Sequence, residues 1–178
     1  MDEGESMSPK VSKIPGPHIR RATSADVTII AEFNLAIARE TEGKELDRNT
    51  VIEGVANFIA ESGRGHYFVA EIDGRIVGQT AITYEWSNWR NGEFWWIQSV
   101  YVHPDHRGTG IFRALYRHVE SLARLEESCC GIRLYMERDN ANARQTYLKL
   151  GMAETGYKVF ETTWQPLSRG TGIEDSTA

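Results

Sequence analysis

The chain has 178 residues, of which 40% are hydrophobic and 25% are charged, and its formal net charge is −5. This length is enough for one domain with a hydrophobic core and short for two. The negative charge and the lack of a Lys/Arg cluster argue against nucleic-acid binding through phosphate contacts, and they are compatible with a cationic substrate. The acidic start lacks the apolar stretch of a secretory signal, and no apolar run could span a bilayer. We expect a cytoplasmic protein without membrane or nucleic-acid partners.

The first half of the chain predicts one strand, two helices and a hairpin. Thr23 with Asp26, and Thr50 with Glu53, have the spacing of helix capping boxes. Asp73-Gly74 is a strong signal for a two-residue hairpin turn. The predicted elements are a flexible lead-in (1–17), a strand (His18–Ala22), helices from Thr23 to Gly43 and from Thr50 to Gly63, and strands His66–Ile72 and Arg75–Tyr84.

The second half alternates strands and helices. Phe94–Val102 is aromatic and β-branched with apolar residues at both parities, which is typical of a strand covered on both faces. The remaining predicted elements are a polar loop (Ser87–Gly92), an amphipathic helix from Ile111, a strand (Ile132–Met136), a helix (Asn140–Leu150), a last strand (Tyr157–Trp164) and a disordered tail (165–178).

A loop with two glycines joins the central strand to the following helix. Gly108 and Gly110 allow backbone conformations that a Cβ would resist, and they let a ligand approach the main chain. The helix directs its free N–H groups and the positive end of its dipole at the same place, and Arg107 adds a cation. These features predict an anion site, most often one for phosphate. An ordinary strand-to-helix turn is the alternative for the two glycines alone.

The run Val102-x-Pro104-x-x-Arg107-Gly108-x-Gly110-Ile111 resembles the acetyl-CoA motif of the GNAT acyltransferase superfamily. Asn140, Ala143 and Tyr147 lie on one helix face and resemble the second signature of that superfamily. Alone, Asn140 is better explained as a helix cap and Tyr147 as a core tyrosine. Together with the glycine loop, they favour the GNAT interpretation.

The resemblance implies the GNAT fold over residues 18–164, a mixed, mostly antiparallel twisted sheet of about six strands flanked by about four helices. The central strand would separate from the next strand, and the pantetheine arm of acetyl-CoA would enter the opening. Phe112 stands where the superfamily has Gly or Ala, so its side chain must turn away from the pyrophosphate. The residues implied in CoA binding are Val100, Tyr101, Val102, Arg107, Gly108, Thr109, Gly110, Ile111, Phe112, Asn140, Ala143 and Tyr147.

Acyl transfer to an amine needs a neutral nucleophile, a stabilised oxyanion and a proton for the departing thiolate. Backbone N–H groups near Val100 are candidates for the oxyanion, and the resemblance assigns the thiolate proton to Tyr147. Glu93 is our candidate for the catalytic base, and Glu40, Glu42 and Glu85 are alternatives for the same role. Glu40, Glu42, Glu85 and Trp86 are the candidates for acceptor contacts, with a solvated surface position as the alternative for each acid.

We predict an acetyl-CoA-dependent N-acetyltransferase that acts on a small molecule with a primary amine and uses no metal. Two other functions stay open, namely a catalytically idle acyl-CoA-binding or sensing module and an acetyltransferase for protein Lys or N-termini. The aromatic loop from Glu85 to Gly92 can line the acceptor site, and a hydrophobic hairpin base or a homodimer contact explains it equally well.

Overall fold

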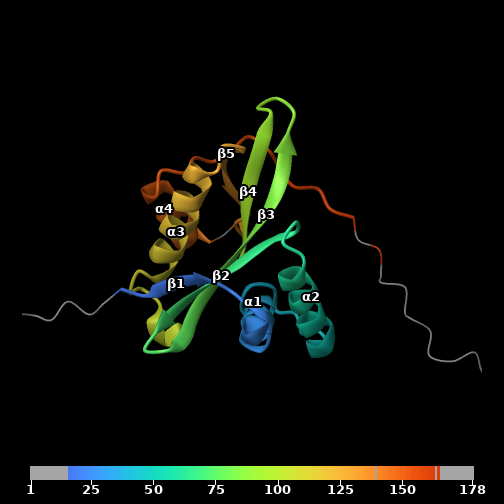
Figure 1. Cartoon of the computed structure of the whole chain (residues 1–178), viewed down its shortest axis with the longest axis vertical. Coiled ribbons are helices and arrows are strands. Elements are labelled where there is room, and N and C mark those ends of the chain that lie inside the picture. The colour runs from blue at the N-terminus through green and yellow to red at the C-terminus, as the bar shows by residue number, and fades with distance from the viewer. Residues whose placement is uncertain (1–15, 139, 163, 165–178) are drawn as a thin grey trace, which may run out of the picture. The chain divides into compact units, whose positions relative to one another are not determined.

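The computed structural model describes residues 16–138, 140–162 and 164, which fall into two units divided between Glu137 and Arg138. The first unit holds a five-stranded sheet whose strands follow their order in the chain (Figure 1). Strands β1 to β4 are antiparallel neighbours, whereas β4 and β5 run parallel. The strands are β1 (His18–Arg21), β2 (Gly65–Ile72), β3 (Arg75–Ser87), β4 (Gly92–Val102) and β5 (Cys129–Leu134).

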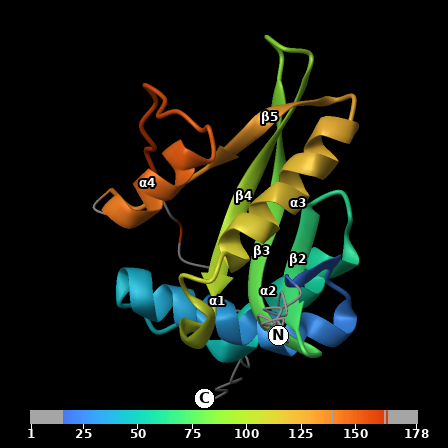
Figure 2. The same ribbon diagram turned by 90° about the vertical axis from the view of Figure 1, so that its left-hand side faces the viewer.

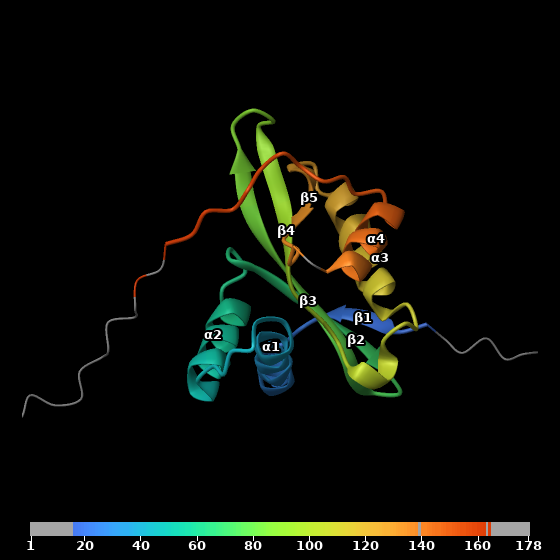
Figure 3. The same ribbon diagram turned by 180° about the vertical axis from the view of Figure 1, so that it is seen from behind.

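Three helices flank this sheet, namely α1 (Val27–Glu42), α2 (Arg48–Ala60) and α3 (Ile111–Leu125). α1 and α2 lie beside each other at one face, and α3 runs along the other face (Figures 2 and 3). None of the helices in the described part of the chain is long and apolar enough to cross a membrane. The mixed, mostly antiparallel sheet with flanking helices confirms the predicted fold class.

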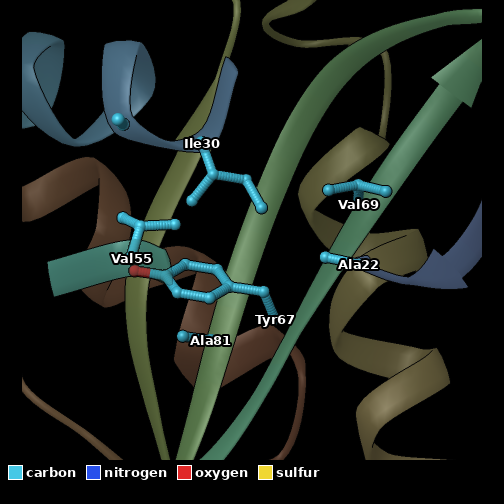
Figure 4. Packing of buried hydrophobic residues seen from close by; sticks show 7 residues of the cluster. Ala22, Ile30, Val55, Tyr67, Val69 and Ala81 are labelled. Carbon is cyan, nitrogen blue, oxygen red and sulfur yellow. The ribbon is translucent and has the colours of Figure 1, made fainter. Parts of the chain in front are cut away.

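The core beneath α1 and α2 is built from small and branched side chains. Ile30 of α1 is fully buried, and it packs in one cluster with Val55 of α2 and with Tyr67 and Ala81 of the sheet (Figure 4). On the opposite face, the ring of Phe68 lies 5.1 Å from the ring of His118 in α3. Successive residues of β2 therefore serve two different cores, as strand alternation requires.

One predicted helix start is confirmed and the other is wrong. The backbone N–H of Thr23 donates to the Asp26 carboxylate at 2.7 Å, as the capping box predicts, in a 3-10 turn that leads into α1. α2 instead begins at Arg48, because Asp47 is the N-cap and accepts from the backbone N–H of Thr50 at 2.8 Å. Thr50 thus lies inside the first turn. Either residue type can cap a helix, and only the backbone path decides between them.

The two hairpins differ in how well they were predicted. Asp73 and Gly74 have φ values of 50° and 74°, which confirms the tight turn between β2 and β3. β3 and β4 extend to Ser87 and from Gly92, so the predicted loop shrinks to residues 88–91. The side chain of Trp89 at this tip is 88% exposed. It therefore does not pack into the hairpin base, which was one of its predicted roles.

β5 begins and ends earlier than predicted, at Cys129 and Leu134. The parallel ladder with β4 sets its position, and Gly131 lies in it beside the ring of Phe94. A Cβ at Gly131 would stand 2.8 Å from that ring. The glycine thus marks a close approach within the strand rather than the end of the preceding loop.

The second unit contains α4 (Ala141–Lys149). Gly151 at φ 90° ends this helix, and the backbone N–H of Met152 donates to the carbonyl of Tyr147 at 3.1 Å, the pattern of a Schellman cap. The predicted strand over Tyr157–Trp164 is wrong for residues 157–162 and 164, which form no strand. No described strand supplies the backbone partners that a strand needs, and Tyr157 and Phe160 are 75% and 93% exposed. The predicted tail at 165–178 and residues 1–15 of the lead-in lie outside the described residues.

A buried ion pair joins β1 to the start of α1. Arg20 donates to both carboxylate oxygens of Asp26 at 2.8 and 2.9 Å, and its Nε donates to Glu71 of β2 at 2.6 Å. Asp26 is 6% exposed. The Arg20 guanidinium lowers the pKa of Asp26 from its ordinary 3.8 to about 2 against the opposing effect of burial. The ionised form is therefore part of the folded state.

We expect Asp26→Asn to lower the free energy of unfolding at pH 7 by about 2 kcal/mol, because each unit of pKa shift corresponds to roughly 1.4 kcal/mol. A lowered carboxyl pKa stabilises the fold above the unfolded value, and this contribution is lost as the pH falls from about 4 to about 2. Urea titrations at pH 7, 4 and 2.5 would measure both effects. The variant should lose less stability than the wild type over the acidic range.

Glu61→Gln is a matched control, since Glu61 forms an exposed ion pair with Arg64 at 2.8 Å. Exposed pairs add little stability. Equal losses in the two variants would contradict a special role for the buried pair.

Candidate active site

β4 contains a bulge at Ser99 and Val100. These two residues together lie opposite Thr80 of β3, between regular pairs on either side. Ser99 has φ 49°, in the left-handed region, where a residue with a Cβ is strained by about 1–2 kcal/mol. A bulge disrupts the ladder and turns backbone groups out of it. Val100, the predicted source of an oxyanion donor, therefore lies where the strand is irregular.

The other edge of β4 loses its neighbour at the same level. β4 pairs with β5 only from Glu93 to Ile97, whereas β4 itself continues to Val102. From Gln98 onward, the backbone that faces away from β3 has no strand partner among the described residues. The ladder ends where β5 itself ends, at Leu134, so this edge of β4 is open because its neighbour stops, and the predicted divergence of two continuing strands stays a prediction. Unpaired backbone groups of this kind can bind an extended ligand as an additional strand would bind.

The glycine loop follows directly after this edge. Gly108 and Gly110 have φ values of 77° and 92°, and Gly110 is the N-cap of α3. The first helical hydrogen bond runs from the N–H of Ala114 to the carbonyl of Gly110. The amides of residues 111–113 thus belong to the turn that has no intrahelical acceptor. The Thr109 hydroxyl fixes the loop by donating to the carbonyl of His106 at 2.6 Å.

Arg107 connects this loop to α1. Its Nε donates to the carbonyl of Val102 at 2.9 Å, and its Nη2 donates to Glu40 at 2.6 Å. The hydroxyl of Tyr101 donates to the other oxygen of Glu40 at 3.3 Å, and the Arg107 guanidinium lies 5.5 Å from the centre of the Tyr101 ring. Burial, then the Glu40 carboxylate, raises the pKa of Tyr101. Arg107 of the loop and Tyr101 of β4 therefore share the carboxylate that Glu40 supplies from the end of α1.

Phe112 is the residue at which the sequence departs from the superfamily pattern. Its ring lies 6.3 Å from the ring of Tyr116, one helical turn later. The ring of Phe112 thus has an aromatic neighbour on its own helix, and the prediction that it turns away from the pyrophosphate stays a prediction.

The predicted acidic residues are distributed over different surroundings. Glu42 pairs with Lys44 at 2.5 Å. Glu85 accepts from Arg133 at 2.8 Å and from the indole N–H of Trp96 at 2.5 Å. Both carboxylates are therefore already compensated, as is that of Glu40. Glu85 and Trp86 are neighbours in β3 and point to opposite faces of the sheet, so the structure does not bring these two candidates together.

Glu93, the predicted base, lies at the start of β4 beside Cys129. Val100 lies seven positions later in the same strand, which corresponds to roughly 20 Å. The structure does not bring Glu93 together with the bulge or with the glycine loop.

The remaining candidates lie in the second unit. The side chain of Asn140 accepts from the backbone N–H of Ala143 at 3.0 Å, which confirms that it caps α4. Ala143 and Tyr147 are four residues apart and share one face of the helix. Burial raises the pKa of Tyr147, so its hydroxyl is protonated at neutral pH.

Among the described residues, no group of three or more His, Cys, Asp or Glu side chains is arranged to hold a metal ion.

The chain matches the model of the "Acetyltransferase (GNAT) family" over residues 31–152, which include the bulge, the glycine loop and α4. The chain belongs to the GNAT family. The predicted resemblance is confirmed.

Similar proteins agree with this assignment. A possible acetyltransferase from Clostridium difficile 630 is 41% identical, with a TM-score of 0.78 over 85% of this GNAT chain and 100% of its own. An uncharacterized N-acetyltransferase of Methanocaldococcus jannaschii is 34% identical over 48% of this chain and 51% of its own. Streptothricin acetyltransferase of Streptomyces lavendulae is 36% identical over 47% of this chain and 42% of its own. The matched segments thus span about half the length of these two curated relatives.

Sequence reasoning missed three features of this GNAT site. Ser99 carries no local signal for a left-handed conformation, because that conformation is common only for Gly, Asn and Asp. Arg133 and Tyr135 lie on β5 or just after it, and the ring of Tyr135 stacks on Trp96 at 4.3 Å. Their contacts with β3 and β4 follow from the parallel register, which the sequence does not contain.

We expect Gly110→Ala to destabilise the fold by about 1 kcal/mol or more, because its φ of 92° strains any residue with a Cβ. Gly54→Ala in α2 is the matched control. In both positions the added methyl meets no atom within 4 Å, so only the backbone differs. The control should raise stability by about 0.5–1 kcal/mol. Urea unfolding measures both values, and equal shifts would refute the backbone explanation.

Proposed function

We propose that this GNAT protein transfers the acetyl group of acetyl-CoA to a primary amine of a small molecule by direct attack. The observation that carries this proposal is the succession of the open edge of β4, the bulge at Ser99 and the glycine loop within one stretch of chain. This stretch offers an extended ligand backbone partners and then an anion site. Acetyl-CoA has an amide-bearing arm followed by a pyrophosphate, in the order that such a site requires.

In this proposal, backbone amides bind most of the cofactor. The arm pairs with the free edge of Val100–Val102, and the pyrophosphate accepts from amides of the loop and first helical turn, residues 108–112. Arg107 contributes mainly by ordering the loop, since two of its nitrogens already bond to Val102 and Glu40. Asn140 and Ala143 are proposed to contact CoA on the resemblance of their motif alone.

The chemistry then needs a donor for the oxyanion and a donor for the thiolate. The backbone N–H of Val100 is our candidate for the first, because the bulge releases it from the regular ladder. Tyr147 is our candidate for the second, because a tyrosine hydroxyl is protonated near neutral pH and burial shifts the pKa of this one further upward. The amine attacks the thioester carbonyl, the tetrahedral intermediate collapses, and the CoA thiolate takes the Tyr147 proton.

The acceptor is an amine in this proposal. The net charge of −5 favours a cation, and the names of the two curated relatives include N-acetyltransferase and streptothricin acetyltransferase. Trp96 and Tyr135 form a stacked pair next to the Glu85–Arg133 ion pair. Such a surface combines aromatic faces with a compensated carboxylate, which suits a small organic cation better than a highly charged one.

The first test measures CoA released from acetyl-CoA in the presence of polyamines, amino acids, aminoglycosides and short peptides. We expect release with a small amine, and a reduction of kcat by about 10²–10³-fold in Tyr147→Phe, typical of a lost general acid. Tyr157→Phe in the same unit is the control, since Tyr157 is 75% exposed.

Release with peptides alone would move the assignment to a protein acetyltransferase. Saturable acetyl-CoA binding without any release would indicate an acyl-CoA-binding module. Equal activity of the two tyrosine variants would remove Tyr147 from the mechanism.

The pH dependence tests how the amine loses its proton. Glu40, Glu42 and Glu85 are each ion-paired, and Glu93 lies far along the strand, so we propose that solvent takes the proton. We expect kcat/KM for the amine to rise about tenfold per pH unit from pH 6 to 9, following the neutral fraction of an amine with pKa near 10.4. A plateau above pH 7 would instead reveal a protein base.

A further inference from the structure

A chain of polar side chains lies against the bulge of β4. The amide of Gln79 in β3 donates to Asn34 of α1 at 2.8 Å and to the carbonyl of Ser99 at 3.3 Å. Asn34 donates to the hydroxyl of Tyr67 in β2 at 3.0 Å, and that hydroxyl donates to Oγ of Ser99 at 3.4 Å. Gln79 and Tyr67 thus bond directly to Ser99, the residue with the strained backbone, and Asn34 of α1 bonds to both of them.

This run of hydrogen-bonded polar side chains reaches into the core of the protein. Gln79 has no exposed surface, and it is surrounded by a core whose other fully buried side chains are mostly aliphatic. Its Oε1 is buried and has no hydrogen-bond partner among the described residues. Burial of an unpaired acceptor is unfavourable, and a native protein that retains one needs an explanation. An apolar residue at position 79 would avoid this penalty.

The strain at Ser99 supplies the explanation. A left-handed conformation of a residue with a Cβ persists only when the surroundings enforce it. Gln79 holds the carbonyl of Ser99, and Tyr67 holds its side chain, so both sides of the strained residue are fixed. The next backbone N–H in the chain is that of Val100.

We infer that Gln79, together with Asn34 and Tyr67, is a positioning residue that keeps the Val100 N–H directed at the thioester carbonyl. This inference rests on the proposed acetyl transfer, and it adds to that proposal the residues that create the oxyanion donor. Without the polar chain, Ser99 relaxes toward an extended conformation, and the bulge shifts or closes. The Val100 N–H then moves away from the thioester carbonyl, although no residue of the acceptor site or of the glycine loop has been substituted.

Gln79→Met tests this inference with a side chain of similar volume that cannot donate. We expect kcat to fall about 100-fold, the loss typical of a donor displaced by about 1 Å, while KM for acetyl-CoA stays within about twofold. Asp26→Asn is the control for lowered stability, because Asp26 belongs to the separate pair with Arg20. A similar fall of kcat in the control, or an unchanged kcat in Gln79→Met, would overturn the inference.

A second substitution distinguishes positioning from a general packing effect. Glycine adopts the left-handed conformation without support. Ser99→Gly introduced into Gln79→Met should therefore restore kcat by at least about tenfold, since that is the part of the loss caused by strain. Ser99→Val in the wild type should reproduce the loss, because a β-branched residue is a severe outlier at positive φ. Absence of rescue by glycine would refute the role of Gln79 in holding the bulge.

A binding experiment separates this inference from the proposed function. The acetyl group is present in acetyl-CoA and absent from CoA, so calorimetry with both ligands compares binding with and without the carbonyl that the Val100 N–H would contact. We expect the preference of the wild type for acetyl-CoA over CoA to disappear in Gln79→Met, while the affinity for CoA is unchanged. If no amine is ever acetylated but this preference is lost as expected, the proposed function fails and the positioning role stands. If amines are acetylated and the preference is unaffected, the positioning role fails alone.

Discussion

β4 is paired on both sides in its first half and on one side in its second half, and the candidate site depends on this change. The parallel ladder to β5 ends at Ile97, the bulge at Ser99 follows two residues later, and the glycine loop begins after Val102. A strand that kept both neighbours would have no free backbone to offer. A single run of about fifteen residues therefore provides an open edge, a displaced amide and a helix N-terminus.

The bulge also explains why the mainly apolar core contains the buried amide of Gln79. The side chains of Asn34, Tyr67 and Gln79 come from α1, β2 and β3, the elements around which the core beneath the helices is built. Polar chains of this kind are specific only when their members meet in the right geometry. Packing of α1 on the sheet is thus a condition for the shape of β4, and fold and site are not separate parts of this molecule.

The parts predicted correctly from the sequence are those that depend on a few neighbouring residues. Left-handed φ at Gly43, Gly74 and Gly110 is a local property of glycine at helix ends and tight turns. The capping of α4 by Asn140 is equally local. The match to two separate motifs then fixed the fold class, because motif order and spacing specify the topology even where single strands are uncertain.

The bounds of β5, the ion pairs of the candidate acids and the conformation of Ser99 depend on partners distant in the chain. The start and end of β5 follow from pairing with β4, and the candidate acids Glu40 and Glu85 are compensated by Arg107 and Arg133, which lie 67 and 48 positions later. A carboxylate in a sequence looks the same whether or not it is paired in the fold. The conformation of Ser99 likewise results from tertiary hydrogen bonds that override its local preference.

The Glu40 carboxylate that Arg107 and Tyr101 share affects how strongly anion binding at the glycine loop depends on ionic strength. Salt weakens attraction between separated charges over a length of about 8 Å at physiological concentration, whereas a direct hydrogen bond from a backbone amide is affected far less. Because Glu40 offsets the charge of Arg107, the glycine loop offers an anion mainly fixed dipoles and little free cationic charge. In the proposed function, binding of a phosphate group by this loop should therefore depend little on the salt concentration.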